Sequence, residues 1–187
     1  MARRRKQSGA GGFVYFLGPI LGYFVPAVFV AIWIYFEARS AILARDLRDA
    51  GHAVETGMAT ALPAIYAQAE ESDGRLAELY QEGDDQSLDR RADGRFDGRS
   101  KLGRQLNHEI VAAESDLQEA GDLSARIIGA LSARSAARTA VLSWAGLTAF
   151  LTLIDGREFM PASALASLFA AVIGLSTYVL ARIFMRN

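Results

Sequence analysis

The sequence predicts an all-α integral membrane protein, with three transmembrane helices and a long antiparallel helical hairpin between the first and the second. Two observations predict this class: apolar residues gather at the two ends of the chain, and charged residues gather in the middle. The net charge of −1 gives no bulk attraction to nucleic acid, so we expect no nucleic-acid partner. The chain has no cysteine, which excludes disulfides and cysteine metal sites.

The chain opens with a basic leader and an apolar run. Residues 1–12 hold the cluster ARRRK and the stretch GAGG, and we expect them to form a flexible leader. Residues 13–36 carry no charge. A helix of that length spans about 36 Å, enough to cross a hydrocarbon core of about 30 Å. A secretory signal peptide is the alternative, but the run is long for one and lacks a small-residue cleavage site.

Two further apolar segments lie near the C-terminus. Residues 139–154 and 159–184 are separated only by the polar link DGRE. The second of them is free of charge as far as Ala181. Two apolar runs with so short a link predict a helical hairpin across the membrane, and so the second and third transmembrane helices.

Small residues recur at four-residue spacing in these segments. Helices in lipid associate through close backbone approach, which small side chains allow. We therefore predict helix-packing faces through which copies of the chain oligomerise. The alternative is chance spacing in an alanine-rich sequence. The predicted packing residues are Gly18 and Gly22 in the first segment and Ala162, Ala166, Ala170 and Gly174 in the third.

Residues 37–138 follow an amphipathic helical pattern on both sides of a polar stretch. We expect one long helix from Glu37, kinked at Pro63 and ending near the sequence SDG at 72–74, with a short segment beyond it to about Glu82. A polar tip follows near 83–100, where Asp-Gly pairs indicate turns. A second long helix then runs without interruption into residues 139–154. The two helices would form an antiparallel, coiled-coil-like stalk outside the membrane.

The side of the membrane that the stalk faces stays open. The basic leader favours a cytoplasmic N-terminus, which would place the stalk on the opposite side. The arginines at the base of the stalk and at the C-terminus favour the reverse.

Residues that carry chemistry are sparse. His52 and Glu55 lie three residues apart, on one face of a helix, and could supply two metal ligands, and His108 lies beside Glu109, but surface histidines are the simpler interpretation of both. We therefore predict no catalytic residue, no cofactor and no metal site. The tandem sequence DGRFDGRS could present Arg95 and Arg99 to an anionic partner. Ordinary turn chemistry is the alternative for its Asp-Gly pairs.

These features predict a non-enzymatic membrane scaffold, or an accessory subunit of a membrane complex. Its partners would be the lipid bilayer and either copies of itself or other subunits. Its location would be the inner (cytoplasmic) membrane of a bacterium.

The alternative is a channel or a stator-type transport subunit. The order of one span, about 100 helical residues and a transmembrane hairpin is similar to that of the ExbB/TolQ/MotA proton-channel family. The stretch SLFAAVIGL at 167–175 resembles the last helix of that family. This resemblance implies ion transport. However, Ala171 stands where that family has threonine, and no span carries an interior carboxylate.

Overall fold

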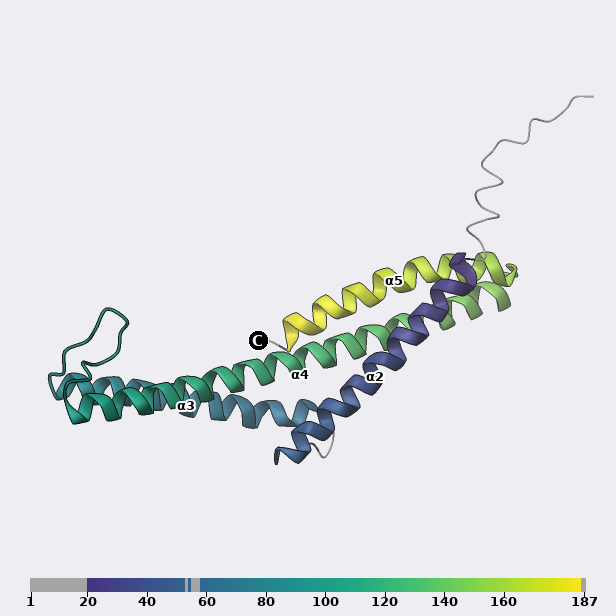
Figure 1. Cartoon of the computed structure of the whole chain (residues 1–187). Coiled ribbons are helices and arrows are strands. Elements are labelled where there is room, and N and C mark those ends of the chain that lie inside the picture. The colour runs from purple at the N-terminus through teal and green to yellow at the C-terminus, as the bar shows by residue number, and fades with distance from the viewer. Residues whose placement is uncertain (1–19, 53, 55–57, 186–187) are drawn as a thin grey trace, which may run out of the picture. The chain divides into compact units, whose positions relative to one another are not determined.

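The computed structural model describes residues 20–52, 54 and 58–185, and the regular elements among them are all helices (Figure 1). The first is a five-residue π-helix, η1, at Ile20–Phe24, which continues into α2. A short 3₁₀ helix, η2, precedes α3. The elements that follow η1 are α2 (Val25–Asp49), η2 (Met58–Ala61), α3 (Leu62–Asp85), α4 (Lys101–Leu153) and α5 (Phe159–Phe184).

Three of these helices are long and apolar enough to cross a membrane. They lie within Gly22–Asp49, Lys101–Leu153 and Phe159–Phe184. This confirms the predicted all-helical class with three long apolar helices. The leader at 1–12 and residues 13–19 of the first predicted span lie outside the described residues. The helix of that first span continues thirteen residues past its predicted end at Phe36.

The chain divides into two compact units. One, here called the apolar unit, combines Met1–Ile42 with Ile128–Asn187 and so holds the charge-free stretches of all three apolar helices. In it, α5 packs antiparallel to the second half of α4, as Figure 1 shows. Small side chains of α5 fill the contact, whereas larger ones such as Leu168 and Val172 stay exposed. Exposed apolar side chains on a helix of this length fit a lipid environment.

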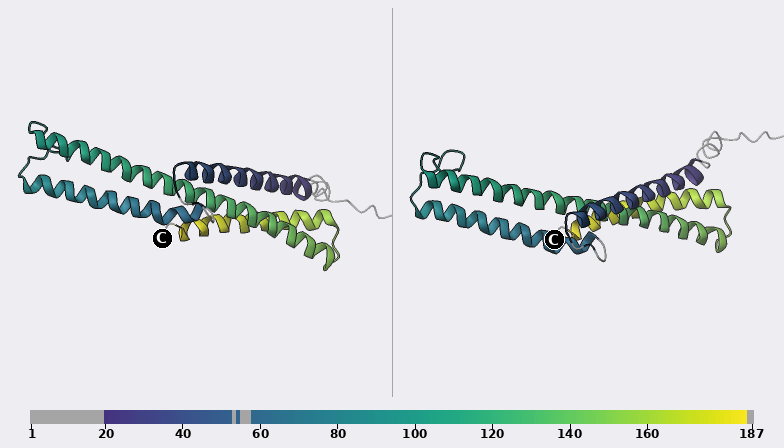
Figure 2. Two further views of the ribbon diagram at one scale, coloured as in Figure 1. Left: turned by 90° about the horizontal axis from the view of Figure 1, so that it is seen from below. Right: turned by 60° about the horizontal axis from the view of Figure 1, so that its bottom comes forward.

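The other unit, Leu43–Ile127, is here called the polar unit. In it, α3 and the first half of α4 lie side by side (Figure 2). Leu76 and Leu79 of α3 share a buried cluster with Leu106 and Ile110 of α4. The helix hydrogen bonds satisfy most of the backbone here, and packing of the amphipathic faces supplies the tertiary stabilisation.

The prediction of one long helix from Glu37 is wrong, because α2 ends at Asp49. The end is a Schellman motif. Gly51 has φ +86°, its N–H bonds to the Arg48 carbonyl, and the His52 N–H bonds to the Leu47 carbonyl. A positive φ suits glycine, which has no Cβ to clash, so this residue stops the helix.

The interpretations of Pro63 and of the sequence SDG are also wrong. Pro63 lies in the first turn of α3. The N–H groups of that turn have no acceptor within the helix, so the N–H that proline lacks is not missed there. Pro63 therefore stands at the start of a helix and does not kink one. Residues 72–74 lie in the middle of α3, which continues to Asp85. Ser72 is buried there.

Candidate functional site

The four small residues of α5 are buried inside the chain itself. Ala162, Ala166 and Ala170 have no exposed surface, and Gly174 is buried as well. A Cβ added at Gly174 would lie 2.9 Å from the Ala140 Cβ and 3.3 Å from the Ala136 carbonyl oxygen. The stripe therefore lets α5 approach α4 of the same chain. A face covered in this way cannot also bind a second copy without rearrangement, so assembly would need another surface.

Gly22, the second residue of the predicted GxxxG pair, lies against the start of α5. It is buried, and a Cβ there would lie 3.2 Å from the Met160 carbonyl oxygen. Gly18 lies outside the described residues. The close approach at Gly22 is again a contact between helices of one chain.

Ser163 joins the three apolar helices at one point. Its hydroxyl donates a hydrogen bond to the Gly22 carbonyl oxygen at 2.5 Å and accepts one from Trp144 Nε1 at 3.1 Å. Gly22 belongs to η1, Trp144 to α4 and Ser163 to α5. Ser163 is fully buried. In an apolar environment an unmade hydrogen bond is costly, so this network fixes the helices in one register.

A second polar contact joins α2 and α4 beyond the charge-free stretches. Arg134 Nε lies 2.7 Å from Glu37 Oε2, and Trp33 Nε1 donates to Glu37 Oε1 at 3.1 Å. Both side chains of the ion pair are partly exposed, so its net contribution to stability is at most about 1 kcal/mol. It nevertheless fixes which parts of the two helices meet.

The predicted polar tip is folded around Phe96, which is fully buried. A Cβ added at Gly83 of α3 would lie only 2.0 Å from Cζ of this ring, so the ring occupies the space that a side chain at Gly83 would need. The Tyr80 ring packs against the Phe96 ring, with the two ring centroids 6.0 Å apart. The Arg90 guanidinium lies over the Tyr80 ring and is bound by Asp84. The hydrogen bond from Arg90 to Asp84 raises the pKa of the guanidinium above its ordinary value.

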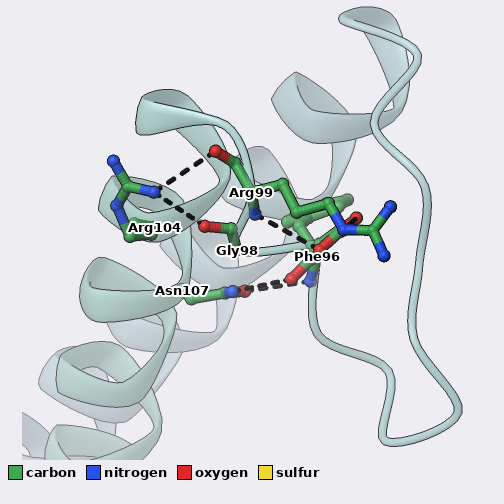
Figure 3. Close-up of polar contacts among 6 residues, drawn as sticks. Phe96, Gly98, Arg99, Arg104 and Asn107 are labelled. Carbon is green, nitrogen blue, oxygen red and sulfur yellow. Dashed lines mark hydrogen bonds and ion pairs between the residues drawn. The ribbon is translucent and has the colours of Figure 1, made fainter.

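Asn107 of α4 holds the backbone of Phe96 from both sides. Its Oδ1 accepts from the Phe96 N–H at 2.9 Å and its Nδ2 donates to the Phe96 carbonyl oxygen at 2.8 Å (Figure 3). Arg104 donates to the carbonyl oxygens of Gly98 and Arg99. One turn of α4 thus binds four backbone groups, from three residues of the loop, which gives residues 86–100 a defined structure.

The two arginines proposed to contact a partner have different surroundings. Arg95 forms an ion pair with Glu114 of α4, and three-quarters of its side chain is buried. Its second terminal nitrogen, Nη1, is buried without a hydrogen-bond partner in the described part of the chain. Arg99 is 94% exposed and lies 3.5 Å from Asp97. Arg95 is therefore part of the folded tip, and Arg99 alone of the pair stands free of the core.

The histidines lie apart from any ligand cluster. His52 is partly exposed after the end of α2, and His108 is exposed on α4. Across residues 20–52, 54 and 58–185 no group of three His, Cys, Asp or Glu side chains is placed to hold a metal ion. Glu55 lies outside these residues.

Sequence reasoning missed three features: Ser163, Asn107 and the burial of Phe96. Hydropathy treats a serine in an apolar run as neutral, so only its position opposite Gly22 reveals its function. Phe96 had a signal, since it is the one large apolar residue between two Asp-Gly turns in a charged stretch. An isolated aromatic residue in such a loop indicates a packing anchor.

Comparisons with models of protein families, with curated proteins and with solved structures found no match.

Proposed function

We propose that the protein is a non-enzymatic membrane scaffold or an accessory subunit of a membrane complex. Its three apolar helices would anchor it in a bacterial inner membrane. The polar unit would form an extramembrane, coiled-coil-like hairpin that presents its tip to another protein.

The observation that carries this proposal is the continuity of α4. It is one uninterrupted helix of 53 residues that begins beside α3 in the polar unit and ends in the apolar hairpin with α5. One helix that belongs to both units supports a structural role, because it joins the polar unit to the apolar unit without an intervening loop. The defined structure of residues 86–100 supports a binding role for the tip, because an ordered loop loses less conformational entropy when it binds.

The decisive experiment is purification from native membranes in mild detergent, followed by native mass measurement and identification of bound subunits. A stable complex that loses its partner on deletion of residues 88–99, while the apolar helices stay assembled, would support a scaffold that binds through its tip. A chain that purifies alone, with a mass that the deletion leaves unchanged, would contradict it.

Three spans also require the two termini to lie on opposite sides of the membrane. Reporter fusions at Met1 and Asn187 should therefore give opposite signals. Equal signals would remove one span from the proposal.

A second candidate function is a channel or stator-type subunit. The observation in its favour is a set of polar groups inside the apolar unit. The hydroxyl groups of Ser40, Ser132 and Thr148 are buried there without a hydrogen-bond partner in the described residues. Such groups commonly bind water. Against it, the charge-free spans offer no carboxylate, histidine or lysine to carry a proton. Ion conductance in reconstituted liposomes separates the two candidates.

A further inference from the structure

The described charged residues of the apolar unit fall into two groups. One group lies at the loop between α4 and α5 and consists of Asp155, Arg157 and Glu158. The other group, here called the basic collar, consists of Glu37, Arg39, Arg134, Arg138 and Arg182. Four arginines against one glutamate leave the collar with a net charge of +3.

The members of the collar come from three helices but lie at the same end of the unit. The ion pair between Glu37 and Arg134 brings α2 and α4 together there. Gly174 of α5 packs on Ala136 and Ala140 of α4. Because α5 runs antiparallel to α4, eight further residues, or about 12 Å, bring Arg182 beside the turn that precedes Arg134.

Three of the four arginines form no ion pair in the described residues, although Arg138 lies near enough to Glu37 to attract it. Arg134 is paired with Glu37, but no described carboxylate forms an ion pair with Arg39, Arg138 or Arg182, and all three are exposed. Arg39 donates to the Tyr35 hydroxyl at 3.5 Å, and Arg182 donates to the Tyr178 hydroxyl at 2.6 Å.

Each of these two tyrosines lies one turn toward the apolar span from its arginine. Tyrosine at such a position occupies the interface between hydrocarbon and headgroups, and an arginine one turn farther out reaches the headgroup layer. The charge-free stretch of α4 begins directly after Arg138. The collar therefore marks the level at which the three helices would leave the hydrocarbon.

We propose that the basic collar binds the headgroups of anionic lipids, and that the end of the apolar unit that carries it faces the anionic leaflet of the membrane. A ring of exposed guanidinium groups from three helices, at headgroup depth, is complementary to phosphate groups that also carry a net negative charge. The proposal rests on the insertion of the three apolar helices in a bilayer, which is part of the proposed function.

The test compares the binding of two spin-labelled lipids to the full-length protein in vesicles of phosphatidylcholine. The labelled lipids are phosphatidylglycerol, which is anionic, and phosphatidylcholine. The fraction of label with restricted motion reports lipid at the protein surface, and the ratio between the two lipids gives the preference. We expect a preference for phosphatidylglycerol that falls as salt rises from 0.1 to 1 M, where the Debye length shrinks from about 10 to about 3 Å.

The collar variant R39Q/R138Q/R182Q should lose this preference, whereas R182Q alone should lower it by up to about fivefold, the effect of one cationic side chain at an anionic surface. The matched control is R75Q/R91Q/R99Q, which removes the same charge from exposed arginines of the polar unit and should keep the preference. Helix content by circular dichroism checks that each variant is folded.

The outcomes are distinguishable. Equal restriction of both lipids by the wild type, or a preference that survives in the collar variant, would overturn the collar proposal alone. Loss of the preference in the control variant would assign it to bulk charge and would also overturn it. No restricted component with either lipid would mean that the helices are not in the bilayer, and the proposed function itself would fail.

Discussion

The hydroxyl of Ser163 donates a hydrogen bond to the carbonyl oxygen of Gly22, a residue 141 positions earlier in the sequence. Gly22 lies in the π-helical turn η1, and glycine there lets the backbone of Met160 approach closely. The same hydroxyl accepts from Trp144. Thus one small side chain joins the first, second and third apolar helices. Its position, more than the hydropathy of the segment, sets how they pack.

Ser163→Ala should lower the free energy of unfolding by about 1–3 kcal/mol, because two hydrogen bonds are lost and such bonds average about 0.6 and reach at most about 1.7 kcal/mol each inside membrane proteins. Trp144→Phe should account for part of this loss, since it removes only the donor at Nε1. The measurement is reversible unfolding in mixed detergent followed by circular dichroism. Ser176→Ala, at an exposed position of α5, is the control. Equal stability of the Ser163→Ala and control variants would disprove the junction.

Gly174→Ala should destabilise the single chain. The new Cβ would lie 2.9 Å from the Ala140 Cβ, which belongs to a short side chain that cannot move aside, so the two helices must separate. Overpacking of this kind costs about 1–3 kcal/mol. Gly146→Ala is the matched control in the span of α4, because nothing lies within 4 Å of the added atom. The experiment measures unfolding and native mass together. A change of oligomeric state without loss of chain stability would show that the stripe packs between chains.

The three long apolar helices could be predicted from hydropathy alone, because a helix that crosses hydrocarbon tolerates few charges and needs a minimum length. For the same reason the sequence predicts the uninterrupted passage from the amphipathic part of α4 into its apolar part: no glycine or proline breaks the pattern near Arg138. The small-residue stripe was recognisable by its spacing. What spacing does not reveal is whether the partner helix belongs to the same chain.

The failures of prediction have local causes. Gly51 and Pro63 were both visible, but a glycine and a proline within an apolar periodicity are compatible with a continuous, kinked helix as well as with an end and a new start. The Schellman bonds at Gly51 decide between them. At the tip, the polar composition of residues 83–100 masked a fold that depends on a single aromatic ring. Phe96 packs on Gly83 and lies beside Asn107, and these contacts cannot be read from residues that are 13 and 11 positions apart.

Gly83→Ala should displace the Phe96 ring from its present position, because the added Cβ would lie 2.0–2.4 Å from three ring atoms. We expect the polar unit to lose about 1–3 kcal/mol, the usual cost of overpacking. Phe96→Ala alone should cost about 3–5 kcal/mol, and adding Gly83→Ala to it should cost little more. Gly74→Ala, in the same helix and with open space around it, should instead be neutral or stabilising by up to about 1 kcal/mol. Additive losses in the double variant would contradict the contact between ring and glycine.

Asn107→Ala should open the loop at 86–100 without unfolding the rest of the polar unit. It removes both hydrogen bonds to the Phe96 backbone and leaves a buried N–H and a buried carbonyl unpaired, at a cost of about 1–3 kcal/mol. The loop holds Arg90, Arg91, Arg95 and Arg99, so trypsin reports its opening directly. If local opening precedes cleavage, each 1.4 kcal/mol lost from the free energy of loop opening should accelerate cleavage about tenfold.

Asn107→Asp keeps the acceptor for the Phe96 N–H but loses the donor to its carbonyl, so cleavage should be intermediate. Gln105→Ala, two residues away on α4, removes only an exposed contact with Glu109 and should be cut like the wild type. A wild-type loop that is cut as fast as the Asn107→Ala variant would show that these two bonds do not keep it closed. The loop would then not be ordered by these bonds, and its order would no longer support partner binding at the tip.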